Sequence, residues 1–90
     1  MSNINVQKLN ETTFEVTVQD RSRTTHMVTV APDYAARLTE GIVSVEQLVR
    51  SSFEFLLERE SNTSILRQFD LPVIARYFPE YERVIRGMLG

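Results

Sequence analysis

Residues 44–58 read SVEQLVRSSFEFLLE and carry the clearest helix signal in the chain. Ser44 and Gln47 have the spacing of a capping box, in which two side chains satisfy free amide groups at the start of a helix. Val43 and Leu48 occupy the two positions of a hydrophobic staple across the same boundary. The sequence therefore predicts a helix over residues 45–59.

The apolar surface of this helix is unusually wide. At 100° per residue an arc of about 200° is covered by Val45, Leu48, Val49, Ser52, Phe53, Phe55, Leu56 and Leu57. Ser52 lies in the middle of the arc, where a small side chain lets another element approach and its hydroxyl can bond back to the helix. One flat sheet cannot cover such an arc, so we expect cover on two sides.

The first thirty residues supply one cover. Polar and apolar residues alternate there with the period of half-buried strands, and the inward set is Ile4, Val6, Phe14, Val16, Val18, His26, Val28 and Val30. This predicts a three-stranded antiparallel meander with its middle strand at 13–19. Matching the apolar faces places Val6 opposite Val16, Val16 opposite Val28, and Val18 opposite His26.

Residues 31–90 read as helices. Pro32-Asp33 ends the third strand, and the pattern predicts a short helix at 33–39 that stops at Gly41. The polar run 61–64 offers caps for another short helix at 64–69. A further helix is expected after Asp70, where Leu71-Pro72 follows a capping residue.

Pro79 separates that helix from the last one, since proline disfavours helical geometry at the residue before it. The final helix has the apolar positions Tyr81, Val84, Ile85, Met88 and Leu89. The residues expected to be buried against helix 45–59 are Leu66, Phe69, Ile74, Phe78, Val84 and Ile85. We thus expect an α+β fold with a single domain over 1–90. In it the N-terminal meander packs on one side of the long central helix, and short C-terminal helices cover the other.

The composition excludes several kinds of chemistry. The chain has no cysteine and one histidine, His26, so disulfides, thiolate catalysis and zinc–thiolate sites are excluded and no metal site is expected. There is no glycine-rich phosphate loop, and no cofactor is expected. No apolar run approaches the length of a membrane span, and the start lacks a signal peptide. We expect a cytoplasmic protein.

The catalytic candidates are few. His26 titrates near neutral pH, but its neighbours on the expected strand face are apolar, and a general base needs a substrate proton within reach. It is expected to be a structural or rim residue. Carboxylates such as Glu46, Glu54 and Glu58 belong to the solvated helix face. We expect no catalytic residue and no enzyme.

One segment has the composition of a protein interface. Residues 76–83 contain two tyrosines, a phenylalanine and two arginines, residue types that dominate interaction hot spots. Aromatic residues also close the core of a small domain, so both roles are open here. The outward set expected to meet a protein partner is Arg76, Tyr77, Arg83 and Arg86.

Residues 24–59 are similar to a ribbon-helix-helix DNA-binding domain. A strand rich in threonine and valine is followed by Pro-Asp, a short helix and a capped helix. The resemblance implies that Thr25, Met27 and Thr29 enter the major groove, with Arg21 and Arg23 as the close cationic pair. The net charge of −2 gives no general basic surface, so nucleic acid is the less favoured partner.

A second resemblance covers most of the chain. The blocks FEFLLERE at 53–60, NTSIL at 62–66, FDLPVI at 69–74 and RYFPEY at 76–81 resemble a family of short bacterial proteins of unassigned function. It implies a bacterial cytoplasmic origin and no activity. The sequence therefore favours a non-enzymatic protein–protein interaction module, with a homodimer as one form. The alternative is a DNA-binding or antitoxin-like regulator.

Overall fold

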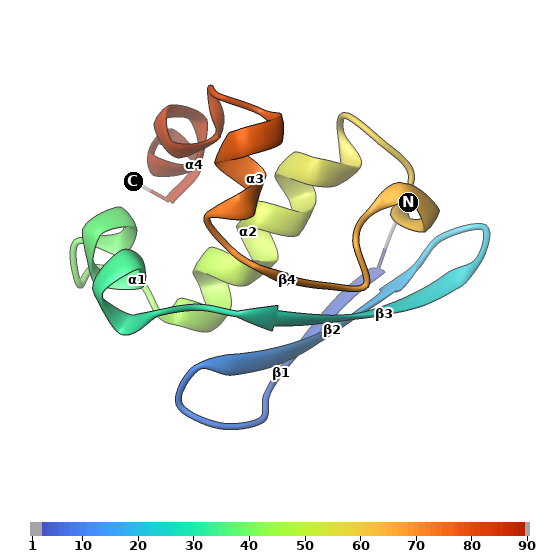
Figure 1. The fold of residues 1–90 in the computed structure, drawn as a ribbon, viewed down its shortest axis with the longest axis horizontal. Helices are drawn as coiled ribbons and strands as arrows, with labels where there is room; N and C mark the ends of the chain where they lie inside the picture. Colours follow the sequence, from blue (N-terminus) through green and yellow to red (C-terminus); the bar gives the residue numbers. More distant parts are fainter. Residues whose placement is uncertain (1–2, 90) are drawn as a thin grey trace.

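The structure is a computed structural model that describes residues 3–89, and it has an α+β architecture (Figure 1). In chain order the elements are β1 (Asn3–Lys8), β2 (Thr13–Gln19), β3 (Arg23–Thr29), α1 (Pro32–Thr39), α2 (Val45–Leu57), a 3-10 turn η1 (Asn62–Ser64), β4 (Gln68–Asp70), α3 (Val73–Tyr77) and α4 (Tyr81–Leu89). The sheet lies on one side of α2 and α4 on the other, and α3 lies beside α4.

The N-terminal meander is confirmed. β1, β2 and β3 are neighbours in antiparallel pairing, and Val6 lies opposite Val16. The register between β2 and β3 is different from the predicted one, since Val16 lies opposite His26. The two registers differ by two positions and keep the same side chains inside, so alternation cannot separate them. The turn between β2 and β3 sets the observed register, because the Asp20 amide donates to the Ser22 carbonyl there.

The helix predicted at 64–69 is wrong. The polar run forms only η1, and the chain then adds a fourth strand, β4, parallel to β3 with Phe69 opposite Val28. Backbone bonds explain the change, since the Met27 amide donates to the carbonyl of Arg67 and the Leu71 amide to that of Thr29. The sheet is therefore mixed and four-stranded, with order β1-β2-β3-β4.

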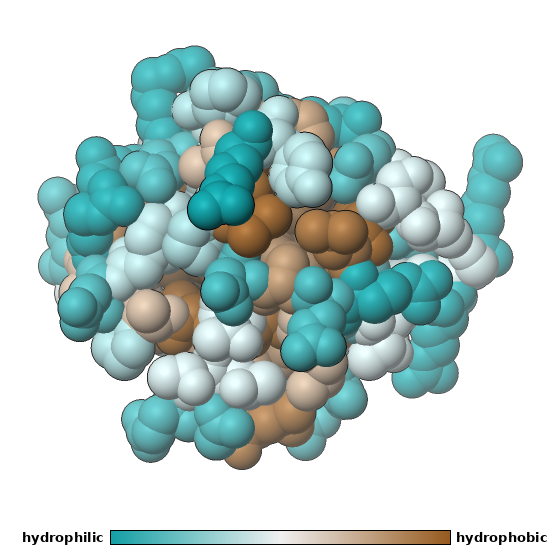
Figure 2. Space-filling model, viewed as in Figure 1, coloured by the Kyte–Doolittle hydropathy of each residue, from teal (hydrophilic) through white to brown (hydrophobic). Residues whose placement is uncertain are grey.

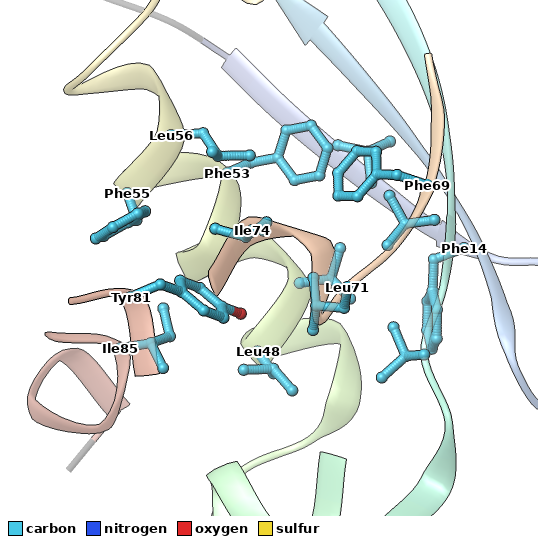
Figure 3. Close-up of a cluster of buried hydrophobic side chains, with 14 of the residues drawn as sticks. Phe14, Leu48, Phe53, Phe55, Leu56, Phe69, Leu71, Ile74, Tyr81 and Ile85 are labelled. Carbon is cyan, nitrogen blue, oxygen red and sulfur yellow. The ribbon is translucent and has the colours of Figure 1, made fainter. Parts of the chain in front are cut away.

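Helix α2 begins as predicted and ends two residues early. The Gln47 amide donates to Ser44 Oγ at 3.1 Å, which is the expected cap, and the last helical residue is Leu57. Its two-sided cover is confirmed, because α2 packs against β1 on one side and against α1 and α4 on others. Figure 3 shows Tyr81 of α4 pointing toward α2. The Tyr81 hydroxyl lies 2.6 Å from Ser52 Oγ.

The break between the last two helices lies at Phe78, whose backbone is extended (φ −130°, ψ 90°), as expected before Pro79. Phe69, Ile74 and Ile85 are buried, and Phe78 and Val84 are half-buried. Leu66 was expected in the core and is 47% exposed. The extended backbone of this segment turns its side chain away, while its carbonyl is held at His26.

Candidate functional site

An open pocket of about 300 Å³ lies between the end of α2, the segment after η1, β4 and α3. Figure 2 shows hydrophobic side chains gathered in the middle of this face, over the region of α3 and β4. Its apolar lining includes Leu56, Ile65, Leu66, Phe69, Ile74 and Phe78. Three further lining residues carry polar groups: Glu60, Ser64 and Tyr77.

A buried hydrogen-bond network fixes one wall of the pocket to the sheet. The side-chain amide of Asn62 donates to the Ser22 carbonyl and to Thr24 Oγ1, both at 2.9 Å. His26 Nδ1 lies 2.8 Å from the carbonyl oxygen of Leu66. Side chains from β3 therefore hold the extended segment between η1 and β4, which cannot form a helix while its carbonyl groups are used in this way.

The network also fixes the orientation of the His26 ring. The Leu66 carbonyl oxygen can only accept, so Nδ1 carries a proton, and in the neutral ring Nε2 accepts from the Thr24 hydroxyl at 2.8 Å. Burial lowers the pKa of His26; the Leu66 carbonyl raises it again in part, and the charge of Arg67 lowers it further. Both ring nitrogens bond to the protein and the ring packs on Phe53. These contacts are typical of a histidine with a structural role.

Among residues 3–89, Glu60 is the only charged residue that lines the pocket. Burial raises the pKa of its carboxyl group, and no neighbouring cation offsets that effect. The ion pairs found within residues 3–89 join Arg37 to Glu82 and Arg59 to Glu58 and Glu80, so none of them involves Glu60. In the described part of the chain, Glu60 thus has no ion-pair partner, and it lies on a wall that is otherwise uncharged and mostly apolar.

Sequence reasoning missed Glu60. It follows Glu58-Arg59 just after a charged helix face, a pattern that is typical of solvated surface. Only the placement of β4 and α3 brings apolar side chains around it. No signal within the sequence of residues 58–61 distinguishes it from the glutamates before it.

The four expected interface residues are all exposed, but they do not line one site. Tyr77 is 67% exposed and lines the pocket. Arg76 precedes it in α3. Arg86 lines a separate small hollow with Ile42 and Leu89, and Arg83 lies on the exposed surface of α4. Of the expected set, the structure brings only Tyr77 to the pocket.

The residues expected to read DNA are on the other face of the sheet. Thr25 and Thr29 are exposed and Met27 is half-buried, while Arg21 and Arg23 are exposed at the β2–β3 turn. β3 lies between β2 and β4, and β4 pairs with its last three residues. That part of β3 has no free edge for a ribbon formed between two chains. DNA binding by these residues stays the less favoured and untested alternative.

Within residues 3–89 no three histidine, aspartate or glutamate side chains are grouped so that they could hold a metal ion. None of the helices in this part of the chain has the length and apolar character to cross a membrane. Comparison with known protein families, with curated proteins and with solved structures finds no match.

Proposed function

We propose that this protein is a non-enzymatic protein–protein interaction module, and that its binding surface is the pocket between α2, β4 and α3. The observation that carries the proposal is the exposure of Leu66 and Tyr77 beside an apolar hollow. Apolar surface that a folded chain leaves open commonly marks a place where a partner binds. Tyrosine is also among the residue types enriched in interaction hot spots.

The proposal includes Arg76, the neighbour of Tyr77 in α3, as a polar rim residue, since interfaces commonly surround an apolar centre with polar side chains. It includes Arg83 and Arg86 as exposed residues of α4 that a partner extending beyond the pocket would reach. It also includes self-association as one form of the interaction, and a bacterial cytoplasmic setting. The resemblance to short bacterial proteins supports that setting.

A pair of matched variants tests the proposal. Ser64 lines the pocket and Thr63 is its exposed neighbour in η1. Ser64→Phe should fill the hollow, whereas Thr63→Phe adds the same bulk outside it. The whole chain is used to select binders from a library of random dodecapeptides. We expect a recurring peptide that binds the parent and Thr63→Phe, and binds Ser64→Phe at least about tenfold more weakly.

Sedimentation of the three proteins over a range of concentrations tests self-association. A dimer that Ser64→Phe abolishes and Thr63→Phe retains would identify a second copy as the partner. Selection of no peptide together with a monomer at every concentration would contradict the proposal. Tight binding of duplex DNA that is lost on changing Arg21 and Arg23 would support the regulator instead.

A further inference from the structure

We infer that the pocket binds a partner segment that carries a large apolar side chain and, close to it, an arginine or lysine that pairs with Glu60. The inference rests on the proposed function and adds the chemistry of the partner.

The dimensions of the pocket favour one or two apolar side chains. Its volume of about 300 Å³ is at the lower end of the range of roughly 300–1,000 Å³ for small-molecule sites. The apolar surface continues beyond the hollow through Leu66 and Tyr77, which are 47% and 67% exposed. A small ligand inside the hollow would leave the outward surface of these two side chains uncovered, whereas a protein segment can cover it while one side chain enters.

Glu60 determines the charge of the partner. An occupant that covers the pocket removes water from this carboxylate, and a buried charge without a counter-charge is strongly unfavourable. A purely apolar segment would therefore bind against the cost of desolvating Glu60, and an acidic one would add repulsion. A basic group close to the apolar side chain offsets both effects, and such charge complementarity is typical of specific interfaces.

The described chain does not supply that cation itself. The nearest arginine in sequence, Arg59, lies over the Phe55 ring at 3.6 Å from the ring centroid and donates to the Phe55 carbonyl. Its Nε donates to Glu80. The other polar lining groups cannot replace it, since the Ser64 hydroxyl bonds to that of Ser61 and carries no charge. A cation that pairs with the Glu60 carboxylate would therefore come from the partner.

Two small probes with the same phenylbutyl body separate charge from hydrophobic contact: 4-phenylbutylammonium and 5-phenylpentanoate. Each is titrated into the isotope-labelled whole chain, and amide shifts are followed by NMR. We expect the amine to shift the amides of the pocket residues and to bind about tenfold more tightly than the acid. Glu60→Gln should reduce this preference to about twofold or less, because the counter-charge is gone.

Glu58→Gln is the matched control, since Glu58 carries the same charge on an exposed position outside the pocket lining. It should leave the preference for the amine unchanged. Equal binding of the two probes by the parent, or a preference that survives in Glu60→Gln, would overturn the inference.

The peptides selected with the whole chain separate this inference from the proposed function. Pocket-binding peptides that lack a basic residue and bind Glu60→Gln as tightly as the parent would refute the inference and leave the proposed function standing. A preference for the amine that depends on Glu60, with no peptide selected and a monomer at every concentration, would refute the proposed function and retain the charge preference. Peptides that combine an aromatic residue with arginine or lysine, and lose about tenfold in Glu60→Gln, support both.

Discussion

The two halves of the cover over α2 differ in how they are closed. On the α4 side Tyr81 and Ile85 are buried, the Tyr81 hydroxyl meets Ser52, and Glu82 accepts from Tyr34 and Arg37. On the β4–α3 side a pocket is open, its apolar rim is exposed, and the carboxylate of Glu60 is not paired. The core is closed on the α4 side, where polar groups bond to partners within the chain, and open on the β4–α3 side, where Glu60 forms no ion pair within residues 3–89.

On the α4 side, buried polar groups have hydrogen-bond partners within apolar surroundings. Ser52 Oγ donates to the Leu48 carbonyl at 2.7 Å and lies against the Tyr81 hydroxyl. The Tyr81 ring meets Phe55 edge-on at 5.3 Å between centroids. Burial raises the pKa of Tyr81 well above its usual range, so the hydroxyl is neutral. In the part of the chain that the structure describes, no equivalent hydroxyl pair or ion pair spans the pocket between α2, β4 and α3.

The largest expected effect compares the two halves directly. Ile85→Ala removes a fully buried side chain of α4 and should lower the free energy of unfolding by about 2–5 kcal/mol, from lost burial plus the cavity left behind. Leu66→Ala should change it by about 0.5 kcal/mol or less, because that side chain is exposed at the pocket. Urea denaturation measures both. Similar losses would remove the distinction between a closed and an open half.

An intermediate effect is expected at the pocket wall. His26→Gln breaks the bonds to Leu66 and Thr24 and should lower the free energy of unfolding by about 1–3 kcal/mol at neutral pH. The folded-state pKa of His26 is lowered from 6.5. Stability is therefore fully present above pH 6.5 and is lost as the pH falls through the folded-state pKa, because the unfolded chain takes up the proton first.

The same variant tests that pH dependence. Denaturation curves of the parent should shift to lower denaturant as the pH falls below 6.5, and His26→Gln should lack this component. A parent protein with constant stability across that range would show that the imidazole is not held neutral, and the wall would have to be fixed in another way.

The smallest expected effect concerns the ion pair on the closed side. Hydrogen bonds from Arg37 and then from Tyr34 lower the pKa of Glu82 from 4.5. The carboxylate thus contributes stability above pH 4.5, which is lost as the pH falls through the folded-state pKa. Glu82→Gln should cost about 1 kcal/mol or less at neutral pH, since solvent and salt screen a half-exposed pair. Thermal denaturation at low and high salt checks this, and a loss as large as that of Ile85→Ala would make the ion pair the main support of α4.

Local patterns in the sequence predicted the parts of the fold that depend on short-range interactions. The cap at Ser44, the apolar arc of α2 and the alternation of β1 to β3 each act over a few residues, and all three are present. The role of Ser52 followed from its place in the arc. These features survive in the folded protein because packing reinforces the local preference.

β4 and the pocket could not be predicted in this way. The strand has three residues and one buried side chain, Phe69, too short a segment to show alternation. Its position depends on backbone bonds to β3 and on His26, which reaches the Leu66 carbonyl across 40 residues of sequence. Apolar side chains surround Glu60 only once β4 has paired with β3. Of the residues that line the pocket, the sequence analysis therefore placed only Tyr77 in the set expected to bind a partner.

That long-range pairing has a kinetic consequence. The two hairpins of the meander close only short loops, whereas joining η1 to the β2–β3 turn brings together Ser22 and Asn62, 40 residues apart. A contact between residues far apart in sequence costs loop-closure entropy before the contact can stabilise the fold. This junction therefore forms late in folding and opens early. Amide hydrogens of β4 should consequently exchange with solvent sooner than those of β2. A partner bound in the pocket would slow that exchange, since it completes the part of the molecule that folds last.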